Sequence, residues 1–438
     1  MSPLLLFVFV FIRRQPNGRM VSVQTASVLL SFAPLLVLSV PPIWTQPEQV
    51  HLSYPGVLGS MVVTWTTFNK TDSKVEYGLQ GGRLFEMSAE GDATVFVDSG
   101  EEKRKMFIHR VTLTGLKPAA TYVYHCGSDE GWSDIFSFTA LNSSSSFSPR
   151  FALYGDLGNE NPQSLARLQK ETQLGMYDVI LHIGDFAYDM HEDNARIGDE
   201  FMRQIQSIAA YVPYMTCPGN HESTYNFSNY RNRFSMPGQT ESLWYSWDLG
   251  SAHIISFSTE VYFYLEYGMD LIFKQYNWLK QDLEEANKPE NRAVRPWIIT
   301  MGHRPMYCSD DDQDDCTKFD SWVRVGRNDI KPAAPGLEDL FYHYGISLKK
   351  HYKEQPYVNP KAPVHIITGS AGCRERTDRF NPNPKEWSAF RSTDYGYSRM
   401  QVVNTTHIYL EQVSDDQYGK VIDSIWVVKE KHGFSAWL

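Results

Sequence analysis

The sequence predicts an antiparallel β-sandwich over residues 46–141, followed by an α/β domain over residues 151–438 in which helices enclose mixed sheets. Short alternating segments recur about every ten residues before residue 140, and a Ser-rich stretch, LNSSSSFSPR, follows them. After this stretch, apolar strand-like runs alternate with helical ones, as in α/β layer folds. With 438 residues, of which 42% are hydrophobic, the chain can bury at least one large core.

The formal net charge of −10 argues against a protein whose main task is binding nucleic acid. It equally gives no basic surface for an anionic membrane. We therefore expect no nucleic-acid partner, and no membrane association unless the N-terminal leader stays attached.

Residues 1–45 are expected to be a leader rather than part of a domain. The run MSPLLLFVFVFIRR is followed by a second apolar run, MVSVQTASVLLSFAPLLVLSVPP. Because export needs only one such run, Met20 is an alternative start, with residues 20–45 as a signal peptide. A signal anchor is the alternative, but the Ser, Thr, Gln and Pro in the second run favour cleavage.

Four glycosylation sequons and five cysteines support export. We predict secretion, with a lysosomal or signal-anchored protein as the alternatives. Cys308 and Cys316 are candidates for a disulfide that closes the acidic loop CSDDDQDDC, which we interpret as solvated rather than as a cation site. The predicted acceptor asparagines are Asn69, Asn142, Asn226 and Asn404.

The β-sandwich is predicted from the segments VHLSY, SMVVTWTTF, KVEYG, HRVTLTGL, TYVYHCGS and IFSFTA, which Gly, Pro and Asp turns separate. Residues 142–150 are the predicted linker. Beyond it, NPQSLARLQKETQLGMY and GMDLIFKQYNWLKQDLEEANK carry apolar residues at helical spacing.

Four strand-like runs in the second domain end in the same way, with Gly followed by a residue able to bind metal. They are RFALYGDLG, DVILHIGDFAYD, YMTCPGNHE and PWIITMGHRP. Groups just past the carboxyl ends of strands in an α/β sheet converge on one crevice. The sequence thus predicts one site containing Asp156, Asp185, Asn220, His221 and His303.

The residue types indicate a metal site with two ions. Carboxylate and amide oxygens favour hard ions, imidazole suits zinc or iron, and the Tyr188 phenolate would bind ferric iron strongly. A carboxylate such as Asp185 can bridge two ions about 3.5–4 Å apart, between which a bridging hydroxide attacks phosphorus. Taken singly, Asp156 or Asp185 would more often cap a helix, and Tyr188 would more often be a packed aromatic. The ordered recurrence of the four endings favours the site.

These blocks, GDLG, GDFAYD, GNHE and GHRPMY, resemble those of the purple acid phosphatases within the calcineurin-like metallophosphoesterases. The leading β-sandwich resembles the family's fibronectin-like domain, and PVHIITGSAGC resembles its late strand. The resemblance spans roughly residues 47–430. It implies that the chain hydrolyses small phosphate monoesters as an acid phosphatase.

The resemblance also implies roles for the candidate residues. Asp156 and Tyr188 would bind a ferric ion, and Asp185 would bridge it to a second, divalent ion, with zinc the first expectation and iron or manganese the alternatives. Asn220 and His303 would bind that second ion. His221 would orient the substrate phosphate and protonate the leaving alkoxide.

One family block is missing from the sequence. The family carries a GHxH or AHxH whose two histidines each complete one ion, but no HxH occurs in this chain. His351, with or without His343, is one replacement; the other hypothesis is a deletion near residues 346–352 that removes the strand carrying the pair. We favour the deletion, because neither histidine follows an apolar run and a Gly.

Three functions remain open from the sequence: a secreted two-metal acid phosphatase whose activity is impaired, an inactive secreted glycoprotein, and an incomplete splice form or gene model of an active enzyme. The predicted impairment follows from the ligand count. Each ion loses one nitrogen ligand, and such a loss weakens metal binding more than the roughly 10–100-fold expected for a group that only contacts a ligand.

Overall fold

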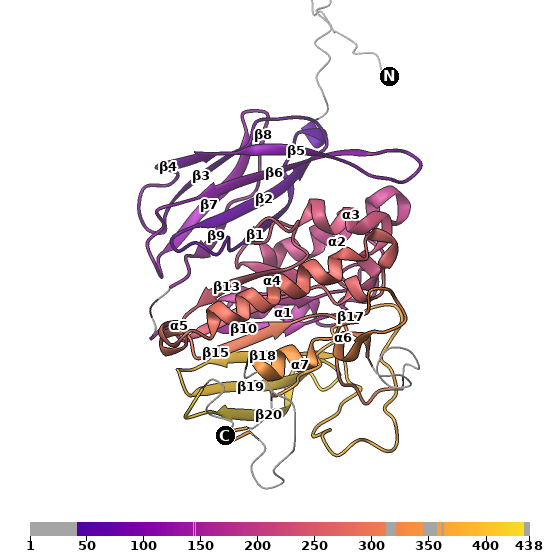
Figure 1. Cartoon of the computed structure of the whole chain (residues 1–438). Helices are drawn as coiled ribbons and strands as arrows, with labels where there is room; N and C mark the ends of the chain where they lie inside the picture. Colours follow the sequence, from indigo (N-terminus) through magenta and orange to yellow (C-terminus); the bar gives the residue numbers. More distant parts are fainter. Residues whose placement is uncertain are drawn as a thin grey trace, which may run out of the picture. The chain divides into compact units, whose positions relative to one another are not determined.

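The computed structural model describes residues 42–142, 144, 146–311, 321–344, 357–360 and 363–432 (Figure 1). Residues 40–438 form one compact unit. Most of the predicted leader, 1–45, lies outside the described residues. Within the described ranges, no helix has the length and apolar character needed to cross a membrane.

The N-terminal region contains two antiparallel sheets, as predicted. One has the order β1 (Glu48–Ser53), β2 (Met61–Thr67), β6 (Lys105–Leu113) and β5 (Asp92–Val97). The other has the order β4 (Met87–Glu90), β3 (Lys74–Leu79), β7 (Thr121–Ser128) and β8 (Gly131–Trp132), with β9 (Phe136–Thr139) also paired to β7. Trp65 of β2 and Tyr124 of β7 are fully buried in the core of this β-sandwich.

The second region is an α/β domain built on a six-stranded mixed sheet. Its order is β12 (Tyr214–Cys217), β11 (Val179–Ile183), β10 (Arg150–Tyr154), β18 (Gly396–Val402), β19 (His407–Ser414) and β20 (Lys420–Val428). Strands β10, β11 and β12 are parallel to one another, and β18, β19 and β20 continue the sheet in antiparallel fashion. The predicted fold class is therefore confirmed.

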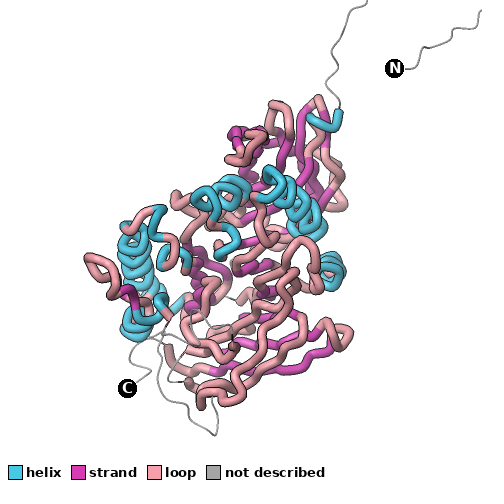
Figure 2. Tube along the Cα trace, turned by 90° about the vertical axis from the view of Figure 1, so that its right-hand side faces the viewer, coloured by secondary structure: helices cyan, strands magenta, loops and turns pink. Residues whose placement is uncertain are grey.

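A second sheet has three strands, and Figure 2 shows helices on the left, upper and right sides of this domain, with strands in its centre and along its lower edge. Its order is β13 (Tyr245–Leu249), β14 (Ala252–Ser256) and β15 (Trp297–Met301), and a small hairpin pairs β16 (Gly326–Arg327) with β17 (Ala334–Pro335). The helices are α1 (Leu165–Gln173), α2 (Glu192–Ala209), α3 (Thr224–Arg233), α4 (Asp270–Ala286), α5 (Pro289–Val294), α6 (Trp322–Val325) and α7 (Glu338–His343).

Helix α4 shows why these segments are helical. Its buried residues recur at intervals of three and four, so that they share one face of a helix with 3.6 residues per turn. Lys274 and Asp270 form an ion pair on the exposed surface of the same helix. The buried residues of α4 are Ile272, Gln275, Leu279, Leu283 and Ala286.

The expected late strand, PVHIITGSAGC, is not a strand in the structure. Residues 363–370 have no strand assignment, and Ile366 and Ile367 are 40% and 54% exposed. The segment runs beside the end of β10 and the start of β18, but its hydrogen bonds to them form no assigned ladder among the described residues. The Gly155 N–H donates to the Thr368 carbonyl at 2.9 Å, and the Gly396 N–H donates to the Ser370 carbonyl at 2.8 Å.

Candidate metal centre

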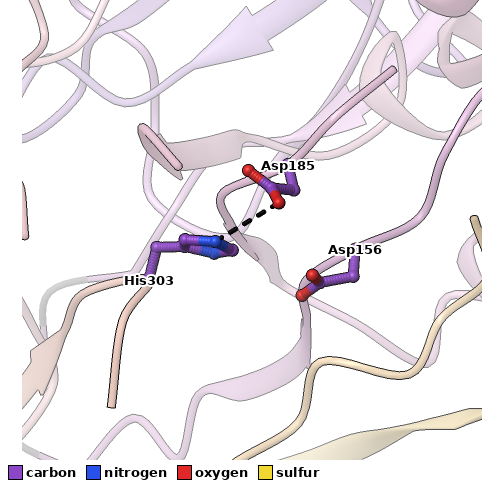
Figure 3. Close-up of side chains that lie close together, drawn as sticks. All are labelled: Asp156, Asp185 and His303. Atoms are coloured by element: carbon purple, nitrogen blue, oxygen red, sulfur yellow. Dashed lines mark ion pairs between the residues drawn. The ribbon is translucent and has the colours of Figure 1, made fainter. Parts of the chain in front are cut away.

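Each of the four predicted strand endings delivers its side chain to one place in the α/β domain. Asp156 follows β10, Asp185 follows β11, and His303 follows β15. Figure 3 shows these three side chains pointing toward one another. One ligand atom from each lies within 4.8 Å of the others. Among the described residues, these three form a group of His and Asp side chains close enough together to hold a metal ion.

Asp185 occupies the middle of the cluster. Its carboxylate is 3% exposed, and Oδ2 lies 3.3 Å from Nε2 of His303. Its other oxygen, Oδ1, accepts the backbone N–H of His221 at 3.1 Å. A carboxylate that faces candidate ligands on both sides has the position expected of a bridging ligand.

His303 is oriented by the backbone of the neighbouring strand. Nδ1 donates to the carbonyl of Ile183 at 3.0 Å, which turns Nε2 toward Oδ1 of Asn220 at 3.1 Å. A hydrogen bond of this kind fixes which ring nitrogen faces a metal ion. Asn220 begins a short 3₁₀ turn, η2 (Asn220–Glu222), directly after Gly219.

Tyr188 and His221 lie on the other side of Asp185. The Tyr188 hydroxyl donates to Oδ1 of Asp156 at 2.9 Å, and its ring packs on the His221 imidazole with centroids 4.3 Å apart. His221 contacts Oδ1 of Asp189 through Nδ1 at 3.1 Å, and its Nε2 faces Oδ2 of Asp185 at 3.9 Å and Oε1 of Glu375 at 3.8 Å. The structure therefore brings together all six residues predicted for the site.

The cluster places two carboxylates beside an imidazole, and each group alters the pKa of the others. Burial raises the pKa of Asp156 to about 7, and the negative charge of Asp185 acts in the same direction. Burial opposes ionisation of Asp185 as well, but the nearby His303 holds its pKa below the ordinary value. Burial likewise lowers the pKa of His303, yet the carboxylates of Asp185 and Asp156 raise it well above the ordinary value. The imidazolium thus supplies positive charge to this acidic cluster, whose oxygen, imidazole and phenol groups fit iron and zinc.

His221 also gains a proton in this environment. Burial lowers its pKa, but the hydrogen bond to Asp189 and the charge of Asp185 outweigh burial and raise the pKa to about 9. A protonated imidazole can donate through Nε2, as a general acid must. Burial raises the pKa of the Tyr188 hydroxyl, together with the charge of Asp156.

The backbone at these loops adopts conformations that side-chain-bearing residues avoid. Asp156, Asp185 and Tyr188 have φ values of 59°, 54° and 55°. Such strain, of order 1–3 kcal/mol per residue, concentrates at functional sites. Glycine is required at Gly219, since a Cβ there would lie 2.2 Å from Oδ1 of Asp185.

Three residues of this region have no assigned role in the sequence-based prediction. Glu222 is 3% exposed and accepts backbone N–H groups from Asp185, Phe186 and Gly219 at 2.9–3.0 Å. Asp189 holds His221, and its other oxygen accepts Nη2 of Arg374 at 3.1 Å. Glu222 and Asp189 lie inside the quoted GNHE and GDFAYD blocks, whereas no sequence signal brings Arg374 to the site.

The remaining predicted residues lie elsewhere. His343 is exposed on α7, and His351 and the junction near 346–352 lie outside the described residues. Cys308 is disulfide-bonded, while its predicted partner Cys316 is also outside the described ranges. None of the four sequon asparagines is buried: Asn404 is exposed, and Asn69, Asn142 and Asn226 are partly exposed.

Three family profiles match consecutive parts of the chain. Residues 47–140 match the purple acid phosphatase N-terminal domain, and residues 149–348 match the calcineurin-like phosphoesterases. Residues 362–424 match a profile described as iron/zinc purple acid phosphatase-like protein C.

Curated relatives extend over most of the chain. Acid phosphatase type 7 of Danio rerio is 71% identical over 417 residues, covering 90% of this chain and 94% of the relative. The Homo sapiens protein of the same name is 56% identical, covering 88% of this chain and 92% of the relative. A more distant relative, the Fe(3+)-Zn(2+) purple acid phosphatase 12 of Arabidopsis thaliana, is 28% identical and covers 90% of this chain and 86% of the relative.

Among solved structures, a purple acid phosphatase from yellow lupin seeds matches with a TM-score of 0.72 at 23% identity. The match covers 90% of this chain and 76% of the lupin chain, and it shows the shared fold.

The alignment with the Danio rerio relative is 417 positions long, which is more than the 90% of the 438 residues of this chain that take part in it. The relative therefore has positions with no counterpart here.

Proposed function

Because the chain belongs to the purple acid phosphatase family of phosphatase enzymes, we propose that it is a secreted acid phosphatase for phosphate monoesters whose two-metal site is incomplete. The observation that carries the proposal is the convergence of Asp156, Asp185 and His303, with ligand atoms within 4.8 Å of one another. Asn220 and Tyr188 adjoin this cluster through His303 and Asp156.

In the proposed site, Asp156 and Tyr188 would hold a ferric ion, Asn220 and His303 would hold a divalent ion, zinc by first expectation, and Asp185 would serve both. The Arabidopsis thaliana relative, which is named an Fe(3+)-Zn(2+) purple acid phosphatase, supports this choice of ions. Such an ion pair, when bound, polarises the phosphoryl group and activates water for attack on phosphorus.

The chain's own residues supply positioning and the proton. Asp189 holds Nδ1 of His221 at 3.1 Å, which leaves Nε2 to donate a proton to the departing alkoxide oxygen. The pKa of His221, raised to about 9, keeps this proton in place at neutral and acidic pH. Glu222 accepts the backbone N–H groups of Asp185 and Gly219, and this fixes the positions of the two ligand-carrying loops relative to each other.

The incompleteness of the site is supported by three observations. The sequence has no HxH, the alignment with the Danio rerio relative contains positions missing from this chain, and residues 363–370, where a strand is expected, form none. With Asp185 counted for both ions, each ion has three protein ligands. We therefore propose a deletion near residues 346–352 and impaired metal binding.

The test measures bound iron and zinc in the purified chain together with p-nitrophenyl phosphate turnover at pH 5. We expect low metal content and weak turnover, abolished in Asp185→Ala and in His303→Ala. His343→Ala is the matched control, since this histidine is exposed on α7. Full occupancy of both ions with turnover typical of enzymes, at about 1–10³ per second, would refute the proposed deletion.

A non-catalytic secreted glycoprotein is the second candidate, and the missing ligand block favours it. A folded, metal-free product without turnover in any variant would support this alternative. An incomplete splice form predicts instead that transcripts encode additional residues between 346 and 352. Secretion and glycosylation at Asn69, Asn142, Asn226 and Asn404 are tested by the mass lost on enzymatic removal of N-glycans from the exported chain.

A further inference from the structure

The start of α2 contains three successive residues with left-handed backbone. Asp193, Asn194 and Ala195 have φ/ψ values of 48°/48°, 53°/47° and 65°/16°. L-residues pay roughly 1–2 kcal/mol each for this conformation, with Asn and Asp tolerating it best. Strain of this kind persists where the surroundings hold it in place. We call these three residues the left-handed turn.

The hairpin loop 98–104 of the β-sandwich, which joins β5 to β6, forms hydrogen bonds with the left-handed turn. Arg104 donates through Nη1 to the Asn194 carbonyl at 2.7 Å and through Nη2 to Oδ2 of Asp199 at 2.6 Å. The Glu102 N–H donates to Oδ1 of Asn194 at 3.0 Å. Glu102 also accepts Nδ2 of Asn194 at 3.3 Å and Nη2 of Arg196 at 2.6 Å, so Arg104 and Glu102 together join the loop to the turn and to the helix that follows it.

Packing reinforces these hydrogen bonds. Ala195 is fully buried in a small apolar cluster with Phe96, Met106 and Ile108 of the β-sandwich. Gly100 lies so close to the turn that a Cβ there would be 2.7 Å from Oδ1 of Asn194. The loop therefore fits the turn closely, both through polar contacts and through the apolar side of Ala195.

The left-handed turn and the residues on either side of it are hydrogen-bonded to the metal-centre loop. Within the turn, the Ala195 N–H donates to the His191 carbonyl at 3.1 Å, and just before it the Glu192 N–H donates to the Asp189 carbonyl at 3.0 Å. Gly198 N–H donates to the Met190 carbonyl at 3.1 Å. The backbone that carries Asp189, and with it the partner of His221, is thereby anchored to the turn.

We propose that Arg104 of the β-sandwich is a positioning residue that clamps the left-handed turn and so fixes the loop carrying Tyr188 and Asp189. Its consequence for catalysis rests on the proposed phosphatase site. The clamp itself belongs to the metal-free protein, so it can be tested whether or not the chain binds metal.

The test is amide hydrogen exchange by mass spectrometry on the full, metal-free chain carrying Arg104→Met. Removing a hydrogen-bonding charge of this kind should accelerate exchange across residues 186–198 at least about tenfold, with β19 unchanged. Arg203→Met is the matched control. Arg203 also joins α2 to the β-sandwich, through Glu48 at 2.7 Å, but among the described residues it forms no hydrogen bond with the left-handed turn.

A second substitution separates clamping from general packing. Asp193→Gly removes the left-handed penalty at an exposed position of the turn, since Gly adopts this conformation readily, and it leaves the buried Ala195 in place. Added to Arg104→Met, it should restore slow exchange in 186–198. If Arg104→Met does not fold, Gly100→Ala, which pushes the loop off the turn, should give the same local acceleration.

Unchanged exchange in residues 186–198, equal acceleration throughout the chain, the same effect from Arg203→Met, or no recovery with Asp193→Gly would each overturn the proposal. Absence of turnover in the unsubstituted chain would count against the proposed catalytic function alone, because the exchange experiment uses no metal and no substrate.

Discussion

At the residue scale, the side chain of Glu222 holds the loops that carry the candidate ligands. Its two oxygens accept three buried backbone N–H groups, from Asp185, Phe186 and Gly219. Burial raises the pKa of this carboxyl to about 8, and the three N–H groups oppose the rise. Glu222 therefore links the GD and GNHE blocks through hydrogen bonds rather than through a metal.

We expect Glu222→Leu to lower the free energy of unfolding by at least about 3 kcal/mol, since three buried donors would lose their acceptors. Chemical denaturation of the metal-free chain measures this loss. Glu266→Leu, at an exposed position, should change stability by less than about 0.5 kcal/mol. Equal losses in the two variants would contradict the linking role of Glu222.

His253 offers a second test at the residue scale, away from the metal centre. Nδ1 lies 2.7 Å from Oδ1 of Asp248, and Nε2 lies 2.9 Å from Oδ2 of Asp282. Burial lowers the pKa of His253, but the two carboxylates outweigh burial and raise it to about 9. The imidazolium therefore holds β14 to α4, because Asp282 belongs to that helix.

The folded-state pKa of His253 lies above the unfolded value, so its contribution is complete below about pH 6.5 and is lost as the pH rises through about 9. We expect on the order of 3 kcal/mol across this window. Denaturation curves at pH 6 and pH 9.5 measure it. His253→Gln should remove the difference attributed to this residue, whereas His343→Gln should leave it in place.

At the scale of elements, strand ends require glycine where two loops meet. Gly184, at the end of β11, has φ of 76°, and a Cβ there would lie 2.5 Å from Nδ1 of His303 and 2.9 Å from Cα of Gly219. Gly175 has nearly the same φ, 71°, with no atom within 4 Å of a Cβ. Both glycines therefore have left-handed backbone, but only at Gly184 would an added Cβ collide with neighbouring atoms.

We expect Gly175→Ala to cost about 1 kcal/mol, the penalty of the left-handed backbone alone. Gly184→Ala should cost several kcal/mol more, since His303 or the Gly219 loop must shift. Thermal or chemical unfolding of the metal-free chain gives both values. A loss in Gly184→Ala no larger than in Gly175→Ala would show that His303 is not held against this strand end.

At the scale of the whole molecule, an incomplete ligand set should make folding nearly independent of metal. A bound ion stabilises the folded state by an amount that grows with the ratio of ion concentration to dissociation constant. With three ligands for each proposed ion, we expect chelation to lower the free energy of unfolding by less than about 1 kcal/mol. Asp185→Asn should show no response to chelation, and a loss of several kcal/mol in the unsubstituted chain would contradict the incomplete site.

The local sequence pattern determined that a β-sandwich precedes an α/β domain and that the predicted ligands meet at one site. Apolar alternation and helical spacing report which faces of a segment are buried. The ends of neighbouring parallel strands necessarily lie at one edge of a sheet. Asp156, Asp185 and Asn220 could therefore be grouped before any coordinate was known, and the absence of an HxH is a property of the sequence itself.

Contacts between distant segments were decided by the tertiary structure. PVHIITGSAGC has the composition of a strand, but a strand needs a continuous ladder, and among the described residues this segment makes scattered hydrogen bonds to β10 and β18 without an assigned ladder. The clamp of Arg104 on Asn194 joins residues 90 positions apart. Local periodicity identifies which segments can be buried. The hydrogen-bond partner of each polar group depends instead on which distant segment folding places next to it.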